Sequence, residues 1–216
     1  MDNCEFHNTT ILVVHEIYGI NNHIKDICDS LNKLGFTVVC PNLLGNTENY
    51  CYKDEDRAYK HFVHEKGFDT SADKIISIAK ELRTNSSNLY ILGFSVGATI
   101  AWICSKYDGL FDGVIGFCGS RIRDYLEVSP KCETLLIFPT KEKSFDPEIV
   151  VTKLKTKNMI QIIKVEGSHG FTDQSTPNYD QYSTEYCFQK MRDFIMKQNQ
   201  QKNKFLLHFC PIPLWL

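Results

Sequence analysis

The sequence predicts an α/β fold in which a mainly parallel central sheet is covered by helices on both faces. The first observation is a series of six short runs, four to six residues each, that are rich in β-branched residues and almost continuously apolar. Such runs are typical of strands buried on both faces of a parallel sheet. The second observation is that helical patterns lie between the runs, so that strands and helices alternate. The predicted strands are Thr10–His15, Thr37–Cys40, Leu89–Leu92, Val114–Cys118, Thr134–Phe138 and Ile160–Val165.

The helices are predicted from apolar residues that recur at three- and four-residue spacing, which is the spacing of one buried helix face. They are Ile24–Leu34, Ala72–Leu82, Ala98–Tyr107 and roughly Tyr182–Gln198. The stretch Gly45–Phe68 is polar and aromatic without a strand pattern. We expect it to form a helical excursion that caps one end of the sheet.

The chain length of 216 residues favours one domain, which we place at residues 1–200, without an internal repeat or linker. A chain of this length buries about 70% of its unfolded surface without needing disulfides or metals. Residues 201–216 form an apolar C-terminal tail of unknown role. A tail packed on the body is the first interpretation, and a partner-binding or swapped segment is the second.

Charge and composition exclude several classes of function. There are 24 Lys and Arg residues against 26 Asp and Glu residues, for a net charge of −2, so no nucleic-acid partner is expected. No signal peptide or membrane-spanning run is predicted, and no membrane partner is expected. The nine cysteines are scattered, with no two closer than 11 positions, which favours a reducing cytoplasm over a disulfide framework or a zinc motif. We expect a monomer or a small homo-oligomer.

The sharpest motif is Gly93-Phe94-Ser95-Val96-Gly97, a G-x-S-x-G pattern directly after an apolar strand and before a helical run. In this context, the serine occupies a strained turn that lifts its hydroxyl to the sheet edge, and the two glycines permit close approach of strand and helix. The helix N-terminus behind it presents free N–H groups, and the Val96 amide would be one oxyanion donor. The motif therefore predicts Ser95 as a nucleophile.

A serine nucleophile needs a base, and in folds with this turn the chain order is serine, acid, histidine. His169 fits as the base, because it lies in a Gly-rich loop after the last predicted strand. The acid should follow the strand Thr134–Phe138, where Glu142 and Asp146 are both candidates. Glu142 is closer to the strand end and is favoured, whereas Asp146 precedes Pro147 and fits a helix N-cap.

With the strand, the serine turn and the histidine loop established, the chain from about Ile11 to Met196 resembles the dienelactone hydrolase family of the α/β-hydrolase superfamily. The most specific similarity is His15-Glu16-Ile17-Tyr18-Gly19, followed by Asp56-Arg57-Ala58-Tyr59-Lys60 and by Ser-His-Gly-Phe-Thr-Asp around His169. The resemblance implies that Glu16 is an active-site glutamate and that the Ile17 N–H completes the oxyanion hole. It also implies that Arg57 helps to hold a substrate carboxylate. Glu142 falls where the family places its acid.

Each of these residues has a plainer alternative. Glu16 could cap or bridge near the first strand, and Arg57 could be a solvated surface residue. Arg121 and Arg123 could reach an anionic substrate, but surface positions are favoured for both. Tyr18, Phe94 and Phe171 flank the predicted site and suggest an apolar pocket, with core packing an equal possibility for Phe94 and Phe171.

The predicted activity is hydrolysis of a small ester or lactone, anionic or neutral, through an acyl-enzyme intermediate. No metal or organic cofactor is expected. Two departures from the family, a serine in place of the cysteine of its best-studied members and a glutamate in place of the usual aspartate, leave the identity of the ester open. The alternatives are an acyltransferase or thioesterase on the same fold, or a binding protein with an idle site.

Overall fold

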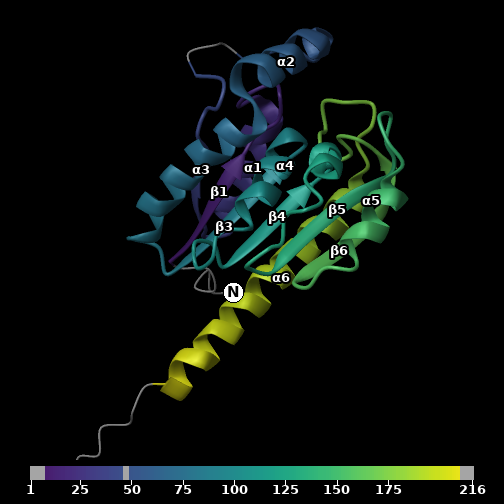
Figure 1. Cartoon of the computed structure of the whole chain (residues 1–216). Helices are drawn as coiled ribbons and strands as arrows, with labels where there is room; N and C mark the ends of the chain where they lie inside the picture. The colour runs from purple at the N-terminus through teal and green to yellow at the C-terminus, as the bar shows by residue number, and fades with distance from the viewer. Residues whose placement is uncertain (1–7, 46–48, 210–216) are drawn as a thin grey trace, which may run out of the picture.

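The computed structural model describes residues 8–45 and 49–209 and contains a six-stranded, all-parallel sheet (Figure 1). The strand order is β2-β1-β3-β4-β5-β6, so the chain starts near one edge and reverses direction across the sheet after β2. The strands are β1 (Thr9–Val14), β2 (Thr37–Val39), β3 (Asn88–Phe94), β4 (Gly113–Phe117), β5 (Thr134–Lys141) and β6 (Ile160–Ser168). All six predicted strands are confirmed, with ends displaced by up to three residues.

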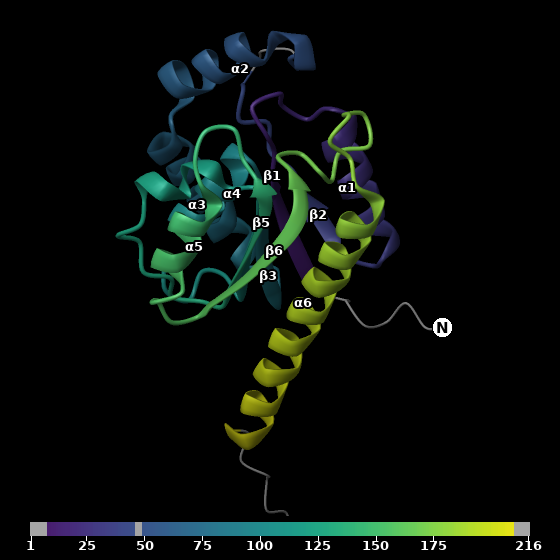
Figure 2. The ribbon, with the colours of Figure 1, turned by 90° about the vertical axis from the view of Figure 1, so that its right-hand side faces the viewer.

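Helices cover both faces of this sheet. They are α1 (Asn22–Lys33), α2 (Glu55–His61), α3 (Phe68–Arg83), α4 (Val96–Cys104), α5 (Pro147–Leu154) and α6 (Gln181–Phe209). Figure 2 shows α1 and α6 on one side and α3, α4 and α5 on the other. The apolar run of β1 is unbroken because both faces of the strand are buried. Ile11 and Val13 pack with α1 and α6 on one face. Leu12 and Val14 pack with α3 and α4 on the other.

Burial on both faces holds for the four inner strands but not for the two edge strands. β1, β3 and β4 are almost fully buried, as is β5 up to its last two residues, whereas β2 has no fully buried residue. β6 alternates instead, and its Gln161, Lys164 and Glu166 are exposed. An edge strand borders solvent, and the apolar run of β6 is interrupted for that reason.

The segment before α3 is helical, as expected, and lies over the carboxyl ends of the strands. It contains the short helix η1 (Tyr52–Asp54), α2 and the wider turn η2 (Phe62–Lys66). Figure 2 places α2 beyond the strand arrowheads. Ala58 and Phe62 are fully buried in the cluster formed by α3 and α4, which fixes this excursion to the body.

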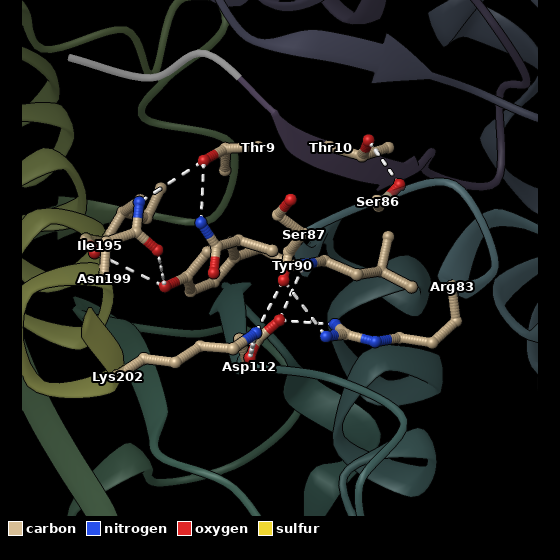
Figure 3. Close-up of polar contacts among 12 residues, drawn as sticks. Thr9, Thr10, Arg83, Ser86, Ser87, Tyr90, Asp112, Ile195, Asn199 and Lys202 are labelled. Carbon is tan, nitrogen blue, oxygen red and sulfur yellow. Dashed lines mark hydrogen bonds and ion pairs between the residues drawn. The ribbon is translucent and has the colours of Figure 1, made fainter. Parts of the chain in front are cut away.

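Helix α6 continues well past the predicted end at Gln198, to Phe209. Its residues make polar contacts near the amino ends of the strands (Figure 3), at the end of the molecule opposite to α2 (Figure 2). The Tyr90 hydroxyl donates to Asn199 Oδ1 at 2.8 Å, and Lys202 Nζ lies 2.5 Å from Asp112 Oδ1. Residues 201–209, predicted as part of a tail, therefore continue the helix, and Lys202 joins it to the body. Residues 210–216 lie outside the described residues.

Asp112 is the centre of this network. It accepts hydrogen bonds from the Leu89 N–H at 2.8 Å and from Arg83 at 2.5 Å in addition to Lys202. Burial alone would raise the pKa of Asp112, but these three donors outweigh it and hold the pKa below its usual value. Within the part of the chain that the structure describes, no helix combines the length and apolarity needed to cross a membrane.

Candidate active site

Ser95 lies on a strained turn between β3 and α4. Its backbone has φ of 55° and ψ of −114°, a conformation that L-residues rarely adopt. A Cβ on Gly93 would lie 2.1 Å from the Gly97 carbonyl oxygen, and a Cβ on Gly97 would lie 2.1 Å from the Val14 carbonyl oxygen. The turn therefore requires both glycines, as the motif predicts.

The structure brings His169 and Glu142 to this serine. His169 Nε2 lies 3.0 Å from Ser95 Oγ, and His169 Nδ1 lies 2.9 Å from Glu142 Oε1. Glu142 follows directly after β5 and His169 directly after β6, so parallel strands deliver all three side chains to one sheet edge. The Glu142 side chain is 3% exposed and the His169 side chain 35% exposed. The arrangement is a continuous hydrogen-bonded chain with its serine end open to the cavity.

Asp146 has a different structural role. Its Oδ1 accepts a hydrogen bond from the Glu148 N–H at 2.9 Å and caps α5, with Pro147 in the first turn. The geometry therefore pairs His169 with Glu142 and not with Asp146.

The protonation of His169 reflects two opposing effects. Burial lowers its pKa, but the hydrogen bond and negative charge of Glu142, with smaller contributions from Glu16 and Glu55, raise it. The net result is a pKa above the ordinary value of 6.5. A raised pKa makes the imidazole a stronger base in its neutral form.

Two residues that line the same cavity as Ser95 have backbone N–H groups without a partner in the described part of the chain. Ile17 follows β1 and Val96 begins α4, and both residues line the cavity. Neither N–H donates a hydrogen bond to another of the described residues. They can therefore stabilise an oxyanion without first breaking a protein contact.

His15 holds the loop that carries Ile17. Its Nε2 accepts from the Leu43 N–H at 2.9 Å, so Nδ1 carries the hydrogen and donates to the Glu16 carbonyl at 2.6 Å. Burial lowers the pKa of His15, with Glu16 opposing, which fits this neutral tautomer. The sequence motif contains His15 but predicts no role for it.

The cavity at Ser95 has a volume of about 440 Å³. Tyr18 and Tyr52 contribute phenol groups to its wall, and burial raises the pKa of both, so they remain protonated hydrogen-bond donors. Phe94 and Phe171 are buried in the core on the α1 and α6 side instead. Of the two predicted roles, pocket lining and core packing, the structure therefore shows core packing for both. The other charged groups in the wall are Glu16, Glu55, Asp56, Arg121, Arg123, Lys143 and Asp173.

The family resemblance predicts that Arg57 helps to hold a substrate carboxylate. Arg57 is not among the described residues that line the Ser95 cavity, and its role stays a prediction. Arg57 is exposed and lies over the Tyr50 ring, 5.6 Å from its centroid, beside a separate surface depression. The reason is the rotation of α2, which buries Ala58 and turns Tyr59 toward the Ser95 cavity. Arg121 enters the cavity wall instead, where its Nη1 donates to the Tyr59 hydroxyl at 2.9 Å.

Arg123 also lines the cavity, although a surface position was favoured for it and for Arg121. Its Nη1 donates to the Ser120 carbonyl at 2.5 Å, and Arg121 Nε lies 2.5 Å from Asp124 Oδ2. Both arginines belong to the short helix η3 (Ser120–Asp124), which follows β4 at the carboxyl edge of the sheet. This position explains why they reach the cavity.

Glu16 lies in the cavity wall within a buried cluster that the sequence did not reveal. His23 Nδ1 is 3.7 Å from Glu16 Oε1, and Asp173 completes the group. Asp173 belongs to the Ser-His-Gly-Phe-Thr-Asp motif that contains His169. Its place in this motif was the only feature of the sequence that could have indicated a position near the site. Among the described residues, this cluster and the set Cys118, Glu142 and His169 each place three possible metal-ligand atoms within 4.8 Å of one another.

Comparison with known proteins identifies the family of this chain. Residues 3–199 match the model of the dienelactone hydrolase family. The uncharacterised protein YczH of Bacillus subtilis (strain 168) is 37% identical over 171 residues, which cover 78% of this chain and 83% of YczH.

Solved structures share the fold. A dienelactone hydrolase-like promiscuous phosphotriesterase from metagenomic libraries superposes with a TM-score of 0.70 at 15% identity, covering 88% of this chain and 86% of that one. Est1E from Butyrivibrio proteoclasticus, solved with ferulic acid bound, gives a TM-score of 0.66 at 11% identity and covers 92% of each chain. The chain thus has the α/β-hydrolase fold and belongs to the dienelactone hydrolase family, a membership that supports hydrolase activity on esters or lactones.

Proposed function

We propose that this chain is a serine hydrolase that cleaves a small carboxylic ester or lactone through an acyl-enzyme on Ser95. The observation that carries the proposal is the hydrogen-bonded series from Ser95 Oγ through His169 to Glu142, with contacts of 3.0 and 2.9 Å. These are the distances over which a base can take a hydroxyl proton and an acid can orient the base. Membership of the dienelactone hydrolase family supports the same chemistry.

In the first half-reaction, Ser95 Oγ forms a bond to the substrate carbonyl carbon while its proton passes to His169 Nε2. The carbonyl oxygen becomes an oxyanion between the Ile17 and Val96 N–H groups, each of which lowers the barrier by about 3 kcal/mol. Glu142 stabilises the imidazolium of His169. The carbon–oxygen bond to the leaving alcohol then breaks, and His169 gives that alcohol its proton.

In the second half-reaction, water attacks the acyl carbon and gives a proton to His169. The bond between Ser95 Oγ and the acyl carbon breaks, the acid leaves, and the proton returns to Ser95. For a lactone, the alcohol and the acid are two ends of one product. The cavity of about 440 Å³ lies within the range of small-molecule sites, which supports a compact substrate.

The test is steady-state hydrolysis of a panel of p-nitrophenyl esters, thioesters and five-membered lactones. We expect Ser95→Ala to lower kcat/KM about 10³-fold or more for every substrate that the wild type cleaves. Ser144→Ala is the matched control, because Ser144 lines the same cavity and the ring nitrogens of His169 bond to Ser95 and Glu142 instead. Equal loss in the two variants, or hydrolysis by folded Ser95→Ala at the wild-type rate, would contradict the proposal.

A further inference from the structure

A second group of chemically active side chains lies beside the proposed catalytic serine and has no part in the mechanism above. Glu16 follows β1, His23 lies at the start of α1, and Asp173 belongs to the loop before α6. Their exposed fractions are 7%, 4% and 2%. One ligand atom from each lies within 4.8 Å of the other two.

His23 has one ring nitrogen without a partner. Nε2 lies 3.2 Å from the Thr172 hydroxyl, but Nδ1 has no hydrogen-bond partner among the described residues. Nδ1 lies 3.7 Å from Glu16 Oε1, which is too long for a hydrogen bond. A buried nitrogen facing a carboxylate at this separation requires a positive charge, which is either a proton on the imidazole or a cation between the two groups.

The separation matches two ligands of one metal ion. Zinc–nitrogen and zinc–oxygen bonds are about 2.0–2.2 Å long. Two such bonds at a tetrahedral or trigonal angle place the ligand atoms roughly 3.3–3.8 Å apart. The distance of 3.7 Å between His23 Nδ1 and Glu16 Oε1 falls within that range.

The surroundings also resemble the supporting shell of a metal site. Ligating histidines generally use the other ring nitrogen for a hydrogen bond, as Nε2 does with Thr172. Asp173 Oδ1 accepts from the Ser175 N–H at 2.9 Å and from its hydroxyl at 2.7 Å, and the Tyr52 hydroxyl donates to Oδ2. These contacts orient the carboxylate while leaving it lone pairs for a metal.

Charge favours a divalent cation over a monovalent one. Two buried carboxylates carry a charge of −2 together, which a single divalent ion balances. One imidazole among three protein ligands suits Zn²⁺ better than Ca²⁺, which takes six to eight oxygen ligands. Glu16 and Asp173 both line the Ser95 cavity, so an ion has an entry path from there.

We propose that Glu16, His23 and Asp173 form a binding site for a Zn²⁺-like transition-metal ion in the cavity wall, with water as the fourth ligand. This site is separate from Ser95, His169 and Glu142. The proposal of a metal site does not depend on whether the chain hydrolyses esters.

The test is isothermal titration of chelator-treated full-length protein with Zn²⁺, with folding checked by circular dichroism. We expect one Zn²⁺ per chain in the wild type and binding at least about 100-fold weaker in His23→Gln. Thr172→Val keeps all three ligands and removes only the partner of Nε2, so it should weaken binding about 10–100-fold. Cys118→Ser and the surface change His64→Asn are controls that should leave the affinity unchanged.

Each outcome decides the proposal. No stoichiometric binding by the folded wild type would mean that a proton on His23 is the positive centre, and would overturn the metal site. Binding lost in Cys118→Ser but kept in Thr172→Val would assign the ion to the cluster around His169 and would also overturn it. If His23→Gln fails to fold, the Zn²⁺ affinity of Thr172→Val still tests the proposal, because an affinity equal to wild type would contradict it. Labelling of Ser95 by a fluorophosphonate in the same preparations reports on the hydrolase proposal independently.

Discussion

Replacing Glu142 with Gln tests which acid assists His169. Glu142 Oε1 lies 2.9 Å from His169 Nδ1. The Glu142 side chain is 3% exposed and the His169 side chain 35% exposed, so solvent screens this contact only from the histidine side. A hydrogen bond between charged groups contributes about 1.5–3 kcal/mol. At about 1.4 kcal/mol per factor of ten, its loss alone lowers kcat/KM roughly 12- to 140-fold.

The amide also changes the tautomer of His169. A Gln N–H can donate to Nδ1, which favours the imidazole that carries its hydrogen on Nε2 and cannot accept the Ser95 proton. The equivalent acid-to-amide change in a serine protease costs about 10⁴ in kcat. We therefore expect kcat/KM of Glu142→Gln to fall by about 10²–10⁴ relative to wild type.

The assay is the pH dependence of kcat/KM on the best ester of the panel. His169 must be neutral to act as a base, so wild-type activity should rise with pH through a midpoint above 6.5, the ordinary histidine pKa. Glu142→Gln removes the largest influence that raises this pKa, while burial still lowers it. The midpoint should therefore move to lower pH as the maximal rate falls.

Asp146→Ala is the matched control, because it removes the α5 cap and costs about 1 kcal/mol of stability without touching His169. A loss of activity in Asp146→Ala that equals the loss in Glu142→Gln would refute the reasoning. So would an unchanged midpoint in Glu142→Gln.

Three further predictions follow from the structure. Asp112→Asn should lower the free energy of unfolding in urea by about 2–3 kcal/mol at pH 7 with no change in activity per folded molecule. Folding lowers the pKa of Asp112, so the stability difference between wild type and variant should disappear as the pH falls from about 3.9, the pKa in the unfolded chain, through the lower pKa in the folded protein. A stability difference that stays constant over this pH range would contradict the prediction. Gly97→Ala should force α4 away from β1 and cost about 3 kcal/mol, and a melting temperature equal to wild type would disprove the close approach. Arg121→Ala should raise KM for an anionic ester about tenfold more than for a neutral ester. Arg57→Ala should leave both KM values unchanged. If Arg57→Ala and not Arg121→Ala raises KM for the anionic ester, Arg57 binds the substrate.

Most of the fold could be predicted because the strands and helices carry different hydrophobic periods. The inner strands are recognisable because both of their faces are buried, whereas strand ends and the extent of α6 depend on tertiary contacts. Lys202, for example, belongs to α6 and reaches Asp112, a contact that no local pattern reports. The helix α5 was visible only as a capping signal at Asp146 and Pro147.

The candidate site was predictable where the chain itself dictates geometry. The glycines around Ser95 and the order of serine, acid and histidine along parallel strands bring Ser95, Glu142 and His169 to one sheet edge. The direction of a side chain on a short helix is harder to predict. Arg57 and Tyr59 are only two positions apart on α2, yet Tyr59 lines the cavity and Arg57 does not.

The cluster of Glu16, His23 and Asp173 was equally beyond sequence reasoning. Its members lie in three separate loops and helix starts that only the sheet topology brings together.

The most direct measurement of the central claim is labelling of the folded protein with a fluorophosphonate probe, read by intact mass. Wild type, Ser95→Ala and His169→Ala would be compared at equal concentration. An activated serine predicts one adduct per wild-type chain, mapped to Ser95 by peptide mass and absent from both variants. Folded wild-type protein without an adduct, or an adduct that persists in Ser95→Ala, would contradict the account and indicate a site that binds without catalysing.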